Sequence, residues 1–156
     1  MSVKIVLGLT LAAFTAVAAA QDKRPGYGSP INVAAAKRVV AGIIAECQKN
    51  GWNVAAAVVD PHGTLVYYEK MDDTQYASAD IAIGKAKAAA TYRRPTRVFA
   101  DVINKGSPAT ATLPGVVASP GGVPIFVDGK IIGASGVSGV TGDQDEQCSK
   151  AGLGIT

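Results

Sequence analysis

One histidine is the clearest candidate for chemistry in this chain. His62, the only histidine, stands between Pro61 and Gly63, and this composition is typical of a tight turn. An imidazole in an exposed turn is usually inert, but imidazole is also the commonest side-chain ligand of metals and binds haem iron. His62 is therefore a candidate metal ligand, with an ordinary surface histidine as the alternative.

A group of arginines is the second candidate. Arg93, Arg94 and Arg97 lie around Pro95, which ends any preceding helix because it has no N–H donor. Guanidinium groups bind carboxylates and phosphates through paired hydrogen bonds, although arginines at a protein surface are by default only solvated. This bend could hold the acidic group of a ligand.

Two hydroxyls and three apolar side chains complete the candidate site. Ser78 and Thr96 stand where helices are expected to begin, and capping the helix is the simpler role for both. A helix start also offers free backbone N–H donors to an anion. Apolar surface for a flat or ring-shaped ligand would come from Met71, Tyr76 and Tyr92. We predict one ligand site, beside the helix start at Ser78 and the Arg93–Arg97 bend.

Several common chemistries are excluded. A single histidine leaves no HExxH motif and no multi-histidine zinc site. The segment 136–140 lacks the closing glycine of a nucleophile elbow, and the glycines nearby do not fit a dinucleotide-binding fingerprint. The acidic residues of segment 143–146 lack the spacing of a calcium loop. A formal net charge of +3 is too small to indicate nucleic acid as a partner.

The first twenty residues have the pattern of a secretory signal peptide. A positive start at Lys4 precedes an apolar run and a small-residue cleavage site at 18–20. We expect residues 21–29 to be a flexible leader and residues 30–156 to form one domain of ordinary size. No later stretch is apolar and long enough to span a bilayer. The expected location is periplasmic or secreted.

The chain has two cysteines, Cys47 and Cys148, which fall in the first and last predicted helices. An oxidising compartment would join them if those helices meet. Two buried free thiols are the alternative, and we favour the disulfide.

Helices and strands alternate in an order that predicts a layered fold. Apolar residues at every fourth position from Ile31 to Cys47 form one face of a first helix, with Ser29-Pro30 as its start. Two apolar runs, 52–60 and 64–69, form a hairpin around the His62 turn. Further helices are expected at 78–92 (rich in alanine), at 96–105, and from a capping box at Thr141 and Gln144 to Gly152.

The dipeptide Asp128-Gly129 predicts a second hairpin with strands 123–127 and 130–138, because its type I′ turn needs positive φ at both residues. Glycines at 133, 136 and 139 indicate either close packing of a helix or a surface for a ligand. A further short strand at 116–119 is compatible with the pattern. Together the elements predict a three-layer α/β/α sandwich with a central antiparallel sheet, in which the first and last helices share one face. The alanine-rich helix has few large apolar groups, which favours a homo-oligomer packed on its outer side.

Short motifs follow one another along most of the chain. They are Val58-Val59-Asp60 with Gly63 and Leu65, Met71-Asp72, Ser78 with Lys85-Ala86, Pro95-Thr96, segment 121–125, Gly133-Ala134, segment 136–139 and Gln144-Asp145-Glu146. This series resembles the GlcG/HbpS-like proteins over roughly residues 31–152. The resemblance implies a profilin-like α+β fold, related to the haem-binding C-terminal domain of PduO-type proteins, with haem as cofactor and assembly into oligomers. In relatives the histidine of this turn often stands two positions later in the sequence than His62 does here.

Three functions remain open. The resemblance favours an exported haem-binding or haem-sequestering accessory module, with iron held by His62 or by an oxygen donor near Ser78 and Thr96. The second is an enzyme or accessory for a small organic acid, whose carboxylate the arginines would clamp. The third is a cofactor-free module that binds a partner protein. We expect a binding protein rather than an enzyme.

Overall fold

The computed structural model describes residues 24–155. The predicted signal peptide (residues 1–20) and the first three residues of the predicted leader lie outside the described residues. The elements are α1 (Val33–Lys49), β1 (Ala55–Val59), β2 (Leu65–Lys70), α2 (Ser78–Tyr92), α3 (Arg97–Asn104), the 3-10 helix η1 (Pro108–Thr112), β3 (Gly122–Val127), β4 (Lys130–Ser138) and α4 (Gly142–Gly152).

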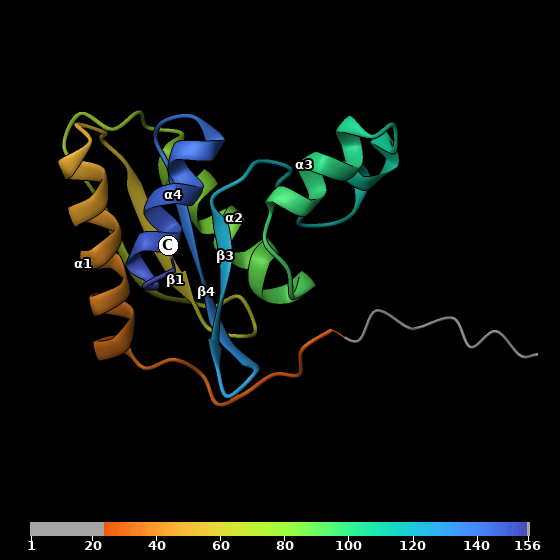
Figure 1. Ribbon diagram of the computed structural model, residues 1–156, viewed down its shortest axis with the longest axis horizontal. Helices are drawn as coiled ribbons and strands as arrows, with labels where there is room; N and C mark the ends of the chain where they lie inside the picture. The colour runs from red at the N-terminus through yellow and green to blue at the C-terminus, as the bar shows by residue number, and fades with distance from the viewer. Residues whose placement is uncertain (1–23, 156) are drawn as a thin grey trace, which may run out of the picture.

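A four-stranded antiparallel sheet, in the order β2-β1-β4-β3, forms the middle of three layers (Figure 1). Alternate residues of β1 face opposite sides, as the two-residue period of a strand requires. Ala56 and Val58 pack with α1 and α4, whereas Ala55, Ala57 and Val59 pack under α2. The predicted α/β/α sandwich, with the first and last helices on one face, is confirmed.

The β3–β4 hairpin confirms the prediction made from Asp128-Gly129. These two residues have φ of 50° and 72°, as a type I′ turn requires. The glycines of β4 are explained by close packing. A Cβ at Gly136 would overlap the Ala82 carbonyl and lie 2.5 Å from the Ala86 amide nitrogen, so only glycine lets α2 lie this close to the sheet.

α1 and α4 are joined on the other face. Cys47 and Cys148 form the predicted disulfide, with their Cα atoms 5.7 Å apart. A Cβ at Gly42 would lie 3.0 Å from the Gly152 Cα, so these helices also touch through glycines. Gly152 belongs to α4, and Gly154 takes the positive φ expected after a helix end.

The described part of the predicted leader, residues 24–29, lies along the sheet. The Gly28 N–H donates to the Ile131 carbonyl and the Ile31 N–H to the Ile132 carbonyl, both at 2.8 Å. β1 ends opposite Ala134, so the leader continues along the edge of β4 that β1 leaves open. Ser29-Pro30 therefore does not begin α1; the Asn32 side chain does, by accepting from the Ala35 N–H.

α3 and η1 stand away from the three layers as an arm (Figure 1). The segment 116–119 that follows them forms no strand. Val117 instead covers α2, 3.2 Å from where a Cβ at Gly84 would lie. Among the described residues, no helix has the length and apolar character needed to cross a membrane.

Candidate functional site

The structure does not bring the eight predicted site residues together. Ser78 begins α2 and Arg93 directly follows it, so the 15 residues of the helix separate them by about 22 Å at 1.5 Å per residue. Met71 and Tyr76 precede α2 and belong to the Ser78 end. The single site predicted from the Ser78 helix start and the arginine bend is therefore split between two ends of α2.

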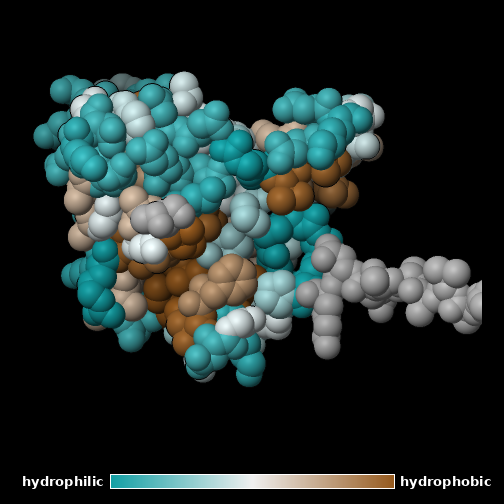
Figure 2. Space-filling view, in the orientation of Figure 1, coloured by the Kyte–Doolittle hydropathy of each residue, from teal (hydrophilic) through white to brown (hydrophobic). Residues whose placement is uncertain are grey.

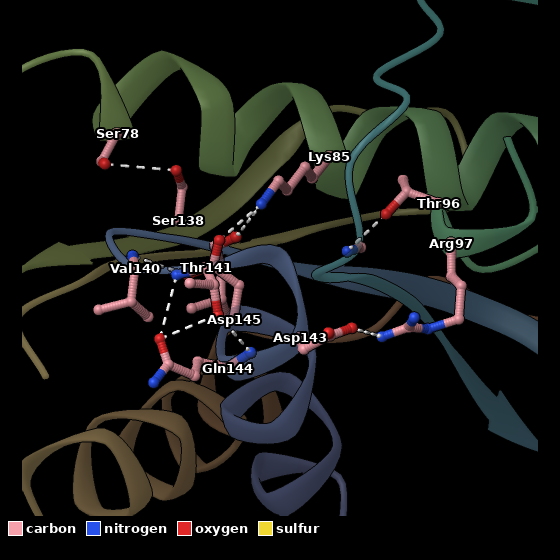
Figure 3. Close-up of polar contacts among 12 residues, drawn as sticks. Ser78, Lys85, Thr96, Arg97, Ser138, Val140, Thr141, Asp143, Gln144 and Asp145 are labelled. Atoms are coloured by element: carbon pink, nitrogen blue, oxygen red, sulfur yellow. Dashed lines mark hydrogen bonds and ion pairs between the residues drawn. The ribbon is translucent and has the colours of Figure 1, made fainter. Parts of the chain in front are cut away.

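Ser78 does not cap α2, contrary to the prediction. Its side chain is fully buried, and its hydroxyl accepts from the Ser138 hydroxyl of β4 at 3.3 Å (Figure 3). The N–H groups of Ser78, Ala79 and Ile81 donate to the carbonyls of a preceding turn. Three of the backbone donors on which the predicted site relied are therefore already used within the chain.

Thr96 is also buried and also does not cap its helix. Its hydroxyl accepts from the Gly122 N–H at 2.9 Å, and its own N–H donates to the Gly122 carbonyl at 3.0 Å. These two bonds fasten the base of the arm to β3. Thr96 thus has a structural role in the fold and is not exposed to a ligand.

Arg97 is held by two carboxylates of α4. It donates to Asp143 at 2.6 Å and to Glu146 through a second, shorter contact (Figure 3). The hydrogen bond that Arg97 donates to Asp143, together with the one it donates to Glu146, raises the pKa of Arg97 above its ordinary value, although burial opposes the rise. Its guanidinium joins α3 to α4, so a ligand would have to displace both carboxylates to bind it.

A buried ion pair near this network has no counterpart among the predicted site residues. Lys85 of α2 donates to the Asp145 carboxylate at 2.8 Å and to the Val137 carbonyl at 3.0 Å (Figure 3). Burial raises the pKa of the Asp145 carboxyl, and the hydrogen bond from Lys85 opposes this rise. The spacing of Lys85 from Ala82 and Ala89, which face the sheet, could have identified it as a buried lysine.

His62 lies at the other end of α2 from Ser78. The Asp60 carboxylate accepts from the His62 and Thr64 N–H groups at 2.8 and 2.9 Å, which fixes the turn. The exposed His62 side chain borders a cavity of about 300 Å³, which we call the histidine cavity. Its other walls come from the chain before α1, from the β1–β2 turn and from the end of α2, namely Tyr27, Gly28, Pro30, Pro61 and Thr91.

Arg93 and Arg94 border a second cavity at the same end of α2. This arginine cavity measures about 260 Å³ and is lined by Arg24, Pro25, Arg93, Arg94, Pro95, Val98 and Phe126. Tyr27 belongs to the histidine cavity, and its ring lies 5.5 Å from the Arg93 guanidinium. The contact between Tyr27 and Arg93 therefore makes the two cavities neighbours.

Tyr92 supports this end of α2 from the arm side. Its hydroxyl donates to the Pro114 carbonyl at 2.7 Å, and its ring meets the edge of Phe99 at a centroid distance of 5.2 Å. Arg24 donates to the Tyr92 carbonyl at 3.1 Å. Arg24 and Tyr27 were not predicted as site residues, because they lie in a segment predicted to be flexible.

The other end of α2 has a cavity of a different character. It measures about 430 Å³ and is lined by Ile44, Gln48, Asn53, Glu69, Lys70, Met71, Asp72 and Asp73. Its charged residues are mainly acidic, which does not suit an anionic ligand. Among residues 24–155, no three histidine, cysteine, aspartate or glutamate side chains come together to hold a metal ion.

Known proteins share both the sequence and the fold. GlcG of Escherichia coli K12 is 43% identical over 103 residues, which cover 66% of this chain and 77% of GlcG. The crystal structure of HbpS superposes with a TM-score of 0.76 at 28% identity, covering 81% of this chain and 90% of HbpS. The structure of a PduOC–haem complex has the same fold, with a TM-score of 0.73 at 24% identity over 80% of this chain and 94% of the other.

A family model extends the match to nearly all the described residues. The model described as "Haem degrading protein HbpS-like" matches residues 31–154. The matched region contains all four strands of the sheet and both helical layers. The chain belongs to the HbpS-like family.

Proposed function

We propose that this chain is a haem-binding or haem-sequestering accessory module and that it binds haem at the C-terminal end of α2. The observation that carries the proposal is the pairing of two cavities, one with the only imidazole of the chain and one with three arginines. Haem needs both kinds of partner, since its iron takes axial ligands such as histidine and its propionates are anionic.

The residues present fit this cofactor. A single imidazole suffices as an axial ligand of haem iron, whereas a free metal ion in a protein needs several side chains. Each cavity alone is near or below the lower end of the range for ligand pockets, about 300 Å³. A macrocycle would therefore use both, with His62 toward its iron and Arg93 and Arg94 toward its propionates.

The relatives support the same choice of ligand. The family model is named for haem degradation, and the PduOC structure is a complex with haem. Of the site residues predicted from the sequence, His62 and Arg93 line the proposed site, and Tyr92 supports it from the arm side. Ser78 and Thr96 are buried, Arg97 is paired, and Met71 and Tyr76 lie at the far end of α2.

Hemin titration followed by absorbance tests the propionate half of this site. Arg93→Ala and Arg94→Ala should each weaken binding by about tenfold, because each removes a charged hydrogen-bond donor. Lys130→Ala, an exposed cation on the β3–β4 hairpin, should leave the affinity unchanged. Equal affinities for all three variants, or only a weak and unsaturable absorbance, would oppose the proposal.

In this proposal the protein acts outside the cytoplasm.

We also propose that it forms a homo-oligomer. The oligomer was predicted from the outer side of α2, but Ala88 and Ala90 of this helix are already buried within the chain. Figure 2 shows a different apolar surface on the face that it draws. Phe126 and Ile155 line one hollow, and these two residues and Val127 are each about half exposed. A second copy would cover this surface. Light scattering that gives a monomer at micromolar concentration would contradict this assembly.

A further inference from the structure

The arginine cavity contains an excess of positive charge with no acidic counterpart. Arg24 comes from the leader, and Arg93 and Arg94 follow α2. No carboxylate lines the cavity, and within residues 24–155 none of the three arginines forms an ion pair. Three like charges around one hollow repel one another, and an anionic ligand would relieve that repulsion.

Hydrogen bonds position these guanidiniums and leave donors to spare. Arg24 donates to the Tyr92 carbonyl at 3.1 Å, and Arg93 donates to the Pro25 carbonyl at 3.3 Å, each through one terminal nitrogen. A guanidinium carries five N–H donors, so both keep several for a ligand. The leader and the end of α2 hold the two arginines beside the same cavity.

The backbone of Arg93 is a second, independent observation. It is left-handed, with φ of 57° and ψ of 42°, at the position after a helix that glycine usually takes. An arginine there is less favourable than glycine, because its Cβ crowds the carbonyl. Backbone strain of this kind often accompanies a functional side chain, and here that side chain borders the cavity.

The other residues that line the arginine cavity determine which kind of group, besides the negative charge, a ligand should carry. Val98, Phe126 and two prolines give the cavity an apolar lining. On the side of the histidine cavity, Tyr27 is anchored by its hydroxyl, which donates to the Ala90 and Thr91 carbonyls at 3.2 and 3.1 Å. The cavity therefore suits a small molecule with an acidic group and an apolar body.

We propose that the arginine cavity binds small organic carboxylates with an apolar body, without any need for haem. The carboxylate contacts the guanidiniums of Arg24, Arg93 and Arg94, and the apolar body packs against Val98 and Phe126. This goes beyond haem binding, since His62 and the histidine cavity take no part.

Calorimetric titration of the full chain with benzoate, in the absence of hemin, tests this inference. We expect saturable binding of one benzoate per chain, weakened about tenfold or more by Arg93→Gly and by Arg24→Gln. Glycine adopts the left-handed backbone without strain, so Arg93→Gly removes the side chain and keeps the helix end. Arg38→Gln, on the exposed surface of α1, is the matched control and should bind as the wild type does.

Benzamide has the same ring without the charge and should bind at least about tenfold more weakly than benzoate. The inference is overturned if benzoate shows no saturable binding, if benzamide binds equally well, or if Arg93→Gly keeps full affinity. A thermal unfolding midpoint of Arg93→Gly at or above that of the wild type shows that lost binding does not reflect lost folding. Because no hemin is present, the result stands apart from the hemin titrations.

Discussion

Lys85 shows most clearly what a single residue does in this fold. Within residues 24–155 it is the largest fully buried side chain, and its ammonium group joins α2 to the Asp145 carboxylate of α4 and to the Val137 carbonyl of β4. Taking either partner away leaves the other charge buried and uncompensated, which costs far more than an exposed ion pair contributes.

We predict that Lys85→Met lowers the free energy of unfolding by about 3–5 kcal/mol. Urea denaturation measures this, and Lys150→Met, which removes the more exposed partner of Glu146, serves as the control with a change below about 1 kcal/mol. The double variant Lys85→Met with Asp145→Leu should recover much of the loss, because it removes both buried charges. A loss for Lys85→Met as small as that of the control would show that the pair is not buried.

Two of the predicted site residues have hydrogen-bond partners that the sequence did not predict. Ser78 and Thr96 fit the local rule for helix caps, but each bonds to a distant strand, through Ser138 and Gly122 respectively. The capping rule considers only hydrogen bonds to the next two or three residues of the chain. It therefore cannot predict a hydrogen-bond partner on a distant strand. Thr141 was predicted correctly because its partner, Gln144, is local.

At the scale of elements, contact between α2 and β4 decides how closely the layers pack. Glycine at 136 lets the Ala82 and Ala86 backbone approach the sheet, and the alanines of α2 complete a contact without large side chains. The glycine pattern left open either this contact or a ligand surface, and the structure shows the close packing of a helix.

We predict that Gly136→Ala destabilises the protein by about 1–3 kcal/mol or more, the usual cost of overpacking a core. The new methyl group would overlap the backbone of α2, which has no room to shift away from the sheet. Gly26→Ala is the matched control, because a Cβ there meets nothing within 4 Å. Thermal unfolding of both variants checks the difference, and equal midpoints would contradict the packing.

The leader pairs with the sheet, and the sequence did not predict this contact. Its glycines and prolines suggest flexibility, yet β1 is shorter than β4, and the exposed edge of β4 pairs with the leader. Strand lengths and their mismatch follow from the tertiary structure, so the sequence alone contained no signal for this pairing. As a result, Arg24 and Tyr27 join the arginine and histidine cavities.

At the scale of the whole molecule, the disulfide connects the two ends of the domain. Cys47 and Cys148 are 101 residues apart in sequence and are both fully buried. The prediction of this bond depended on the two helices sharing one face of the sheet, and that arrangement followed from the hairpins and the order of the elements.

We predict that replacing both cysteines by alanine lowers the free energy of unfolding by about 2–5 kcal/mol, since the bond restricts the unfolded chain. The oxidised protein, unfolded without a reductant, should react with no thiol reagent. Two reactive thiols in that experiment would show that the bond does not form. Equal stability of the variant and the oxidised protein would show that the bond adds nothing to the fold.

The whole fold also explains why the site was only partly predictable. The resemblance and the local motifs identified the turn at His62 and the bend at Arg93, but their positions relative to Ser78 depend on the length and direction of α2. His62 meets this end because the β1–β2 turn packs on the last turns of α2, where a Cβ at Gly63 would lie 3.5 Å from Lys87 and Thr91. Distances of this kind come from the folded chain.

Hemin titration of His62→Ala beside Tyr76→Ala tests the central claim most directly. Both variants remove an exposed ring, but His62 lies at the end of α2 where we place haem, and Tyr76 lies at the other end. We predict a saturable Soret band for the wild type and for Tyr76→Ala, and a shifted band with about tenfold weaker binding for His62→Ala. An unchanged spectrum and affinity for His62→Ala, or a loss of binding confined to Tyr76→Ala, would contradict the account.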